Sequence, residues 1–301
     1  PHNPCKRALA SIEEVEIVAH ASPTPGHAAA AAAQWGGRAY TDYEALLANE
    51  PVDAVWIAVP PDQHGALERA LIDRNIPFLV EKPLAADLRT AEEIAARLQQ
   101  KPLVAAAGYH WRAMDVVPTV QRALAQRPPQ LITAAWHGTT PAPAWWRRRE
   151  QSGGQLLEQA THLFDFARYL VGEATALASA TNYLPRDAFP DLTVDTGSAV
   201  LLRFDNGAVG TVTATCLLQG PSHVYVRFIC DELVITVERD GVTFDDGRER
   251  RHIRASADPV LAENRAFLQA IDHHNPALLY SNYADALNSH RLCWTAQQMA
   301  A

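Results

Sequence analysis

The stretch DAVWIAVPPDQH, residues 53–64, indicates the class of fold. Its residues 54–59 are all apolar, and two prolines, Pro60 and Pro61, follow at once. A short apolar run of this kind is typical of a strand that is buried on both faces of a parallel sheet. The prolines fix the turn into a helix that we expect over residues 62–74, and the start of a helix favours a bound anion or phosphate.

The same alternation extends to both sides of this stretch. We expect strands over residues 15–21, 77–80 and 103–107, and helices over residues 26–34, 41–48 and 87–99. Strands that alternate with helices form βαβ units, in which helices cover both faces of a parallel sheet. A ligand of such a sheet binds in the crevice outside the carboxyl ends of its strands.

The pattern changes after about residue 108. We expect a helix over 115–126, a strand over 131–137, a helix over 153–172, strands over most of 176–254, and helices again at the C-terminus. The turn sequences DNG at 205–207 and DG at 240–241 separate the later strands, as in antiparallel hairpins. We therefore predict an α/β fold in which a doubly wound (Rossmann) parallel sheet, residues 1–108, precedes an α+β domain, residues 109–301, with a large open, mostly antiparallel sheet. The C-terminal helices could pack back on the first domain.

Composition limits the classes of function. The 301 residues carry a formal charge of −8, and this acidic balance argues against a nucleic acid or an anionic membrane as partner. The sequence shows no apolar run near the ~20 residues of a bilayer span and no visible signal peptide after Pro1. The four cysteines are scattered without a CxxC pair, which favours a reduced, cytoplasmic protein without a bound metal.

Residues 153–172, GGQLLEQATHLFDFARYLVG, predict an amphipathic helix between glycines. Its leucines and alanines fall on one face, and the opposite face carries a stripe of Glu158, His162, Asp165 and Tyr169. One interpretation is an ordinary polar face in contact with water. The other is an acid/base unit, because a carboxylate one turn before a histidine can orient the imidazole and raise its basicity.

Lys82 stands in the tripeptide Glu81-Lys82-Pro83, directly after the strand expected over residues 77–80. This position lies at the carboxyl edge of the parallel sheet, where nucleotide ligands of such sheets bind. A lysine there can bond a substrate hydroxyl or a ribose, and its charge can stabilise a developing alkoxide. A solvated loop lysine is the alternative.

Four motifs, taken together, give the chain a family resemblance. They are DAVWIAVPPDQH at 53–64, LVEKPLA at 79–85, GYHWR at 108–112 and WWRRREQSGGQLLEQATHLFD at 145–165. In this order they resemble the Gfo/Idh/MocA family of nicotinamide-dependent sugar and cyclitol oxidoreductases. The resemblance extends over essentially the whole chain, with the later sheet matching in pattern only.

The resemblance implies a site between a dinucleotide-binding domain and a substrate and oligomerisation domain. It places Lys82 between the nicotinamide and the substrate and makes His162 the general base for the substrate hydroxyl. Glu158 corresponds to the acid of the family's catalytic motif, and Asp165 to its later aspartate. The cofactor contacts implied in addition to Lys82 are Pro60, His64, Glu81, Trp146 and Arg147.

Substrate contacts are implied at the aromatic and basic positions around these motifs. Arg112 would serve either the substrate or the domain junction. Tyr109 and Trp145 offer aromatic faces that suit a sugar ring, with core packing as the alternative.

Three departures from the family pattern affect the prediction. The chain has neither the family's first strand nor its glycine-rich loop, so we expect residues upstream of Pro1. Ser22 occupies the position of the acid that binds the adenosine ribose, which removes a repulsion against a 2′-phosphate and slightly favours NADP over NAD. The acid of the catalytic motif is Glu158 instead of aspartate, so its longer side chain could reposition His162 or contact the substrate.

The predicted activity is hydride transfer between nicotinamide and a sugar, a cyclitol or a related polyol. Two alternatives use the same fold: a redox-neutral, NAD-dependent glycosidase, and a regulator that senses a cofactor or a sugar. Lys82 and His162 together favour chemistry, because a sensor needs neither. The open sheet needs a cover, so we also expect a homodimer or homotetramer.

Overall fold

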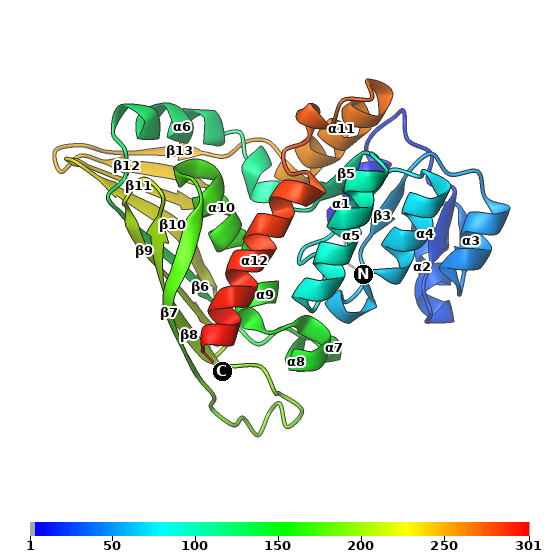
Figure 1. The fold of residues 1–301 in the computed structure, drawn as a ribbon, viewed down its shortest axis with the longest axis horizontal. Coiled ribbons are helices and arrows are strands. Elements are labelled where there is room, and N and C mark those ends of the chain that lie inside the picture. Colours follow the sequence, from blue (N-terminus) through cyan, green and yellow to red (C-terminus); the bar gives the residue numbers. More distant parts are fainter. Residues whose placement is uncertain (1–3, 301) are drawn as a thin grey trace.

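The computed structural model describes residues 4–300, which form two halves that the C-terminal helices connect (Figure 1). In the first half, β1 (Ala19–Ala21) pairs in parallel with β2 (Arg38–Tyr40). A separate parallel sheet has β4 (Phe78–Val80) between β3 (Val55–Ile57) and β5 (Ala105–Ala107). The surrounding helices are α1 (Pro4–Ala10), α2 (Pro25–Trp35), α3 (Tyr43–Asn49), α4 (Ala66–Arg74) and α5 (Leu88–Gln100). The predicted Rossmann-type parallel architecture is confirmed.

The helix expected over residues 62–74 is interrupted. The structure has a short 3₁₀ helix, η1 (Pro61–Gln63), and then α4, with His64 and Gly65 between them. Gly65 has a φ of +102°, which residues with a side chain rarely adopt. The buried carboxylate of Glu68 holds this turn, because its Oε2 accepts a hydrogen bond from Gly65 N at 2.6 Å and its Oε1 bonds His64 Nδ1 at 2.7 Å.

The strand expected over residues 15–21 is also shorter than predicted. Only β1 belongs to a sheet, because residues 15–18 make no ladder of their own.

The second half is built on one eight-stranded sheet in the order β13-β12-β11-β10-β6-β9-β8-β7. Only the β6–β9 pair in it is parallel. Its strands are β6 (Leu131–His137), β7 (Ala174–Asn182), β8 (Gly197–Phe204), β9 (Val209–Thr215), β10 (His223–Cys230), β11 (Leu233–Glu238), β12 (Gly241–Asp245) and β13 (Arg250–Arg254). The large, mostly antiparallel sheet is therefore confirmed, and both predicted turn sequences join hairpins in it.

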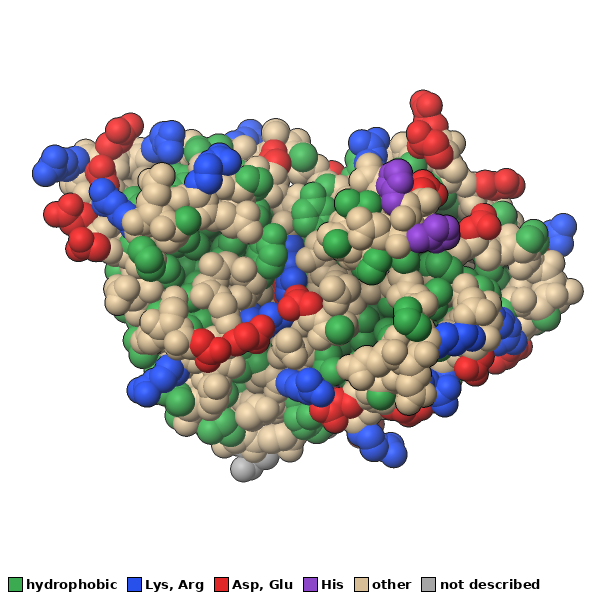
Figure 2. Space-filling model, turned by 45° about the horizontal axis from the view of Figure 1, so that its top comes forward, with side chains coloured by type: hydrophobic (Ala, Val, Ile, Leu, Met, Phe, Trp, Pro, Cys, Tyr) green, Lys and Arg blue, Asp and Glu red, His purple; other side chains and the backbone are tan. Residues whose placement is uncertain are grey.

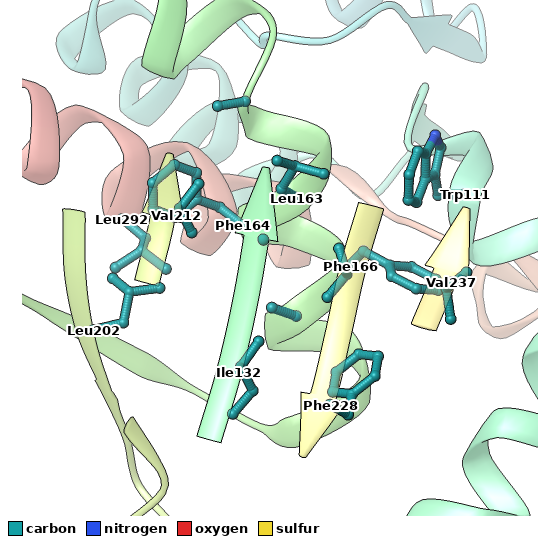
Figure 3. Packing of buried hydrophobic residues seen from close by; sticks show 14 of the residues in the cluster. Trp111, Ile132, Leu163, Phe164, Phe166, Leu202, Val212, Phe228, Val237 and Leu292 are labelled. Atoms are coloured by element: carbon teal, nitrogen blue, oxygen red, sulfur yellow. The ribbon is translucent and has the colours of Figure 1, made fainter. Parts of the chain in front are cut away.

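One face of this sheet carries the largest hydrophobic core. Along β8 the residues alternate between buried and more exposed, as expected for a sheet with one covered face. Phe164 and Phe166 project from α10 (Thr161–Val171) onto buried sheet residues that include Ile132 and Phe228 (Figure 3). The same region holds the short helices η2 (His110–Ala113), α6 (Val117–Gln126), α7 (Ala144–Arg147), α8 (Arg149–Ser152) and α9 (Gln155–Glu158).

The predicted helix over residues 153–172 is two helices, α9 and α10, with a break at Gln159 and Ala160. Ala160 N bonds the carbonyl of Gln155, five residues back, instead of continuing the α-helical ladder. The carbonyl of Glu158 instead accepts a hydrogen bond from Lys82 Nζ at 2.6 Å. The interpretation of a polar face in contact with water is wrong, because every residue of 161–168 is buried.

The C-terminal helices join the two halves. Phe267 of α11 (Pro259–Asp272) packs on Leu79 and Ala106 of the parallel sheet. After η3 (Pro276–Leu278), the helix α12 (Tyr283–Met299) contacts α5 in the first half and α10 and β7 in the second. The chain from residue 259 onward thus covers the first half as well as the second (Figure 1).

Charged side chains of both signs are mixed over the surface in Figure 2, and basic side chains also line the seam between the halves. None of the helices in the described part of the chain has the length and hydropathy that a bilayer span requires.

Candidate active site

The parallel strands deliver three chain segments to one edge of the sheet. Glu81 N bonds Ile57 O at 2.8 Å and Gly108 N bonds Val80 O at 2.9 Å, so the sheet pattern continues one residue past β4 and β5. A side chain at Gly108 would place its Cβ 2.9 Å from Glu81 Oε2. Burial raises the pKa of Glu81, although Lys82 opposes this effect. Glu81 and Lys82 thus lie at the carboxyl edge of the parallel sheet, where the sequence predicted them.

Lys82 forms an ion pair with Glu158 from the other half. Its Nζ lies 2.5 Å from Glu158 Oε1, and both side chains are mostly buried, at 14% and 11% exposure. The second carboxylate oxygen of Glu158 accepts a hydrogen bond from Trp146 Nε1 at 2.6 Å. Glu158 therefore fixes the position of the Lys82 ammonium, and Trp146 fixes Glu158.

His162 lies in an aromatic and basic environment. Its ring stacks on Trp136 of β6, with centroids 5.8 Å apart and planes at 14°, and the His110 ring is 4.9 Å away. The Nδ1 atom is buried and has no hydrogen-bond partner among the described residues. Burial lowers the pKa of His162 well below its usual value, and the charges of Lys82, His110 and Arg239 lower it further. The imidazole is consequently neutral at physiological pH.

The expectation that Glu158 orients His162 is not what the structure shows. Both carboxylate oxygens of Glu158 are engaged, one by Lys82 and one by Trp146. The break between α9 and α10 is the physical reason, because a one-turn relation between residues 158 and 162 requires a continuous helix. Trp136 is the side chain that supports the His162 ring.

Three residues at this site were not among those predicted from the sequence: Trp136, His110 and Arg239. His110 belongs to the GYHWR motif, and burial together with the charge of Lys82 lowers its pKa to about 4. Arg239 is the first residue of the β11–β12 turn, and its guanidinium carbon lies 5.0 Å from the Trp136 ring centroid. Position three residues after a parallel strand, β5, was an available signal for His110, but no sequence feature placed Arg239 near His162.

Arg112 and Asp165 form a buried ion pair at the junction of the halves. Arg112 donates to both oxygens of Asp165, at 2.8 and 2.5 Å, and also pairs with Asp285 of α12. Burial by itself lowers the pKa of Arg112, but these carboxylates outweigh that effect and raise it. Ser289 Oγ donates to Asp165 as well, at 2.6 Å. The structure therefore places both residues in the domain junction.

The aromatic residues predicted to contact substrate are enclosed or lie elsewhere. Tyr109 is fully buried, and its hydroxyl shares a 2.8 Å hydrogen bond with Thr161. Trp145 packs with Phe189 against a small cluster around Trp146. The site proposed below uses neither side chain.

The predicted cofactor residues divide into two groups. Pro60, Glu81 and Lys82 stand at the carboxyl ends of β3 and β4, and Ser22 directly follows β1, where its Oγ accepts from Thr24 N at 3.3 Å. The others have internal partners instead. His64 bonds Glu68, Trp146 bonds Glu158, and Arg147 makes a two-point contact with Asp191 at 2.8 and 3.0 Å.

The donor set at this edge fits a dinucleotide. The 3₁₀ helix η1 begins beside Pro60, Lys82 lies next to the strand ends in its ion pair with Glu158, and the enclosed His162 Nδ1 has no partner among residues 4–300. Within residues 4–300, no group of three or more His, Cys, Asp or Glu side chains has the arrangement of a metal site. The geometry therefore supports acid/base chemistry beside a bound nucleotide.

Comparisons with known proteins give a consistent assignment. The model of an oxidoreductase family with an NAD-binding Rossmann fold, GFO_IDH_MocA, matches residues 2–109. The model of the GFO/IDH/MocA C-terminal domain matches residues 128–236.

Curated relatives match about 70% of the chain. Levoglucosan dehydrogenase of Pseudarthrobacter phenanthrenivorans is 29% identical over an alignment of 245 positions, which covers 71% of this chain and 61% of that protein. The scyllo-inositol 2-dehydrogenase (NAD(+)) of Bacillus subtilis is 24% identical over 216 residues, 70% of this chain and 62% of that one. The chain thus spans less than two thirds of the length of these two relatives.

A solved structure matches the fold over nearly the whole chain. It is levoglucosan dehydrogenase in complex with NADH and levoglucosan, with a TM-score of 0.85 at 20% identity and coverage of 98% of this chain and 92% of that one.

Proposed function

This chain belongs to the Gfo/Idh/MocA family of NAD-binding oxidoreductases, and we propose that it transfers a hydride between the nicotinamide and a secondary alcohol carbon of a sugar or cyclitol. The observation that carries the proposal is the position of a neutral His162 and a charged Lys82 at one site, supplied by the two halves of the chain. The dehydrogenases of levoglucosan and scyllo-inositol among the relatives support the substrate class.

The residues of the chain divide the chemistry between them. When bound at the strand ends near Pro60, Glu81 and Lys82, NAD supplies the hydride acceptor. His162 is neutral and buried, so it takes the proton of the substrate hydroxyl as a general base. The ammonium of Lys82 stabilises the oxygen as it becomes negative.

The surrounding side chains keep these two groups in place. Glu158 accepts hydrogen bonds from both Lys82 and Trp146, and Trp136 stacks on the His162 ring. Burial of these side chains lowers the local dielectric constant, which strengthens the electrostatic interactions between them.

For the choice of cofactor, we propose that the chain accepts NAD and also tolerates NADP. Ser22 stands at the end of β1 and brings no carboxylate to repel a 2′-phosphate. Three of the four cysteines, Cys216, Cys230 and Cys293, are buried free thiols, which suits a reducing compartment such as the cytoplasm.

A two-step experiment tests the proposed function. NADH and NADPH are titrated by fluorescence against the full chain, and polyols are then screened with the preferred cofactor for NAD(P)H formation. We expect turnover with a sugar or cyclitol in the wild type and in a Lys101→Met control, a lysine on the surface that donates to the carbonyl of Asp73. Sugar release from a glycoside without net NADH formation, or cofactor binding without turnover of any polyol, would contradict the oxidoreductase proposal.

We also propose that two copies of the chain cover the outer face of the eight-stranded sheet. Leu131 and Val209 are paired across β6 and β9 and are 38% and 37% exposed, and Leu201 of the adjoining β8 is 41% exposed. Uncovered apolar patches of this kind mark interaction surfaces.

The oligomer prediction is checked by light scattering during size-exclusion chromatography. We expect the mass of a dimer or tetramer, and dissociation on Leu201→Glu because the charge would be buried at the interface. Leu278→Glu on η3, an equally exposed leucine outside the sheet, is the control that keeps the wild-type mass. A monomeric wild type would refute the prediction.

A further inference from the structure

Arg239 is a cation at the proposed site that the mechanism does not use. It follows β11, and its guanidinium lies over Trp136, the ring on which His162 stacks. Its charge lowers the pKa of both His162 and His110. Four separate elements therefore supply neighbouring side chains: η2 supplies His110, β6 supplies Trp136, α10 supplies His162 and the β11–β12 turn supplies Arg239.

The charge of Arg239 has no acidic partner in the described part of the chain. None of the ion pairs there includes Arg239, whereas Lys82 is paired with Glu158. Asp258, whose charge acts on His110, is engaged by the backbone amides of Val260 and Leu261 at the start of α11. Desolvation lowers the pKa of Arg239, but the residue as a whole is exposed, so its guanidinium is open to a ligand from the solvent side.

A guanidinium that lies over an aromatic ring and has no hydrogen-bond partner among the described residues can recognise one kind of ligand. The cation–π contact with Trp136 leaves its N–H donors able to form two parallel hydrogen bonds. Carboxylate and phosphate oxygens match this geometry. Neutral sugar hydroxyls cannot compensate the charge in the same way.

On this basis we propose that Arg239 determines substrate specificity by binding an anionic substituent, a carboxylate or a phosphate, of the sugar or cyclitol. The inference rests on the proposed function, because it places the anion on the molecule whose hydroxyl faces His162. The substrate class is then acidic sugars, such as uronates or aldonates, or sugar phosphates.

The first arm of the test measures kcat/KM with glucuronate, glucose 6-phosphate and glucose as probes. In Arg239→Gln, we expect the ratio of kcat/KM for an anionic probe to that for glucose to fall by about 10- to 100-fold, as for loss of hydrogen bonds to a charged group. Arg227→Gln is the matched control, because Arg227 also stacks on an aromatic ring, Tyr225 at 5.0 Å, in the neighbouring strand β10. We expect it to leave this ratio at the wild-type value. A fall with glucuronate alone identifies a carboxylate, and a fall with glucose 6-phosphate alone identifies a phosphate.

The second arm measures binding by calorimetry and does not depend on turnover. The same three probes are titrated into wild-type protein, Arg239→Gln and Arg227→Gln at saturating NADH. If binding of an anionic probe weakens in Arg239→Gln but not in Arg227→Gln, the proposal is supported even when no sugar is oxidised. The absence of oxidation would then refute the proposed function but not the role of Arg239. Equal binding of anionic probes by wild type and Arg239→Gln, or preference for glucose in both, would overturn the inference.

Discussion

Replacing His162 by alanine is expected to lower kcat by about 100- to 10,000-fold, the range that a general base typically contributes. The cofactor dissociation constant should stay nearly unchanged, because the cofactor residues at the strand ends are on the other half of the chain. His162→Gln tests whether the loss comes from the missing base, since glutamine retains a polar side chain of similar size. Both variants should show the same loss in kcat.

The pH dependence of kcat/KM gives an independent check. Only neutral His162 can accept a proton, and its pKa lies well below 6.5 in the folded protein because of burial and the nearby charges of Lys82, His110 and Arg239. On the acid side, activity should therefore persist until the pH falls to this lowered pKa. The acid limb of the profile should lie below pH 6.5. The limb assigned to His162 should be missing from the residual activity of His162→Gln.

His273→Ala is the control for these measurements. His273 is exposed at the C-terminal end of α11, so its removal should leave both kcat and the pH profile at wild-type values. Wild-type kcat in a folded His162→Ala variant would show that another group is the base.

Replacing Arg112 by methionine is expected to reduce the free energy of unfolding by about 3–5 kcal/mol, the usual cost of removing one partner from a buried ion pair. Arg112 and Asp165 are 3% and 1% exposed at their side chains, and Arg112 also bonds the carbonyl of Tyr280. The variant would leave the Asp165 carboxylate buried without its cation. Urea unfolding followed by circular dichroism measures the change.

Arg291→Met is the matched control for that variant. Arg291 also joins the two halves, through an ion pair with Glu92 of α5, but both side chains are nearly half exposed, at 48% and 44%. Pairs of this kind contribute about 0–1 kcal/mol. A loss in Arg112→Met no larger than that in Arg291→Met would contradict the junction role.

A compensating substitution separates charge burial from lost packing. Asp165→Leu in the Arg112→Met background removes the carboxylate that would be left unpaired, so part of the lost stability should return. If the double variant is no more stable than Arg112→Met, the cost comes from packing.

Helices and strands were largely predictable where the hydrophobic pattern or the capping residue of a segment indicates a single type of secondary structure. β6 covers the predicted residues 131–137, and α5 begins at Leu88 with Asp87 as the N-cap that satisfies Thr90 N. The buried strand β4 follows from an apolar run, because each of its residues has exposure of 1% or less. The interruptions were not predictable: Gly65 and the break after Glu158 both depend on side-chain hydrogen bonds at the turn or from the other half.

The candidate site was only partly visible in the sequence. Lys82 and His162 could be predicted from motifs. The ion pairs could not, because their members are far apart in the sequence: 76 positions separate Lys82 from Glu158, and 53 separate Arg112 from Asp165. Asp165 was as consistent with catalysis as with structure in a helical pattern, and its buried ion pair with Arg112 favours a structural role.

By itself the sequence determined the class of fold, the order of strands and helices, and the segments that bear the chemical groups. Periodicity and turn residues encode these features locally, because they depend on neighbours within a few residues. Only the tertiary structure decided which groups act together. In the folded chain the Glu158 carboxylate bonds Lys82 instead of His162, Trp136 stacks on His162, and Arg239 lies over Trp136. These pairings depend on how two independently patterned halves pack against each other, and on the burial that changes the pKa of His162.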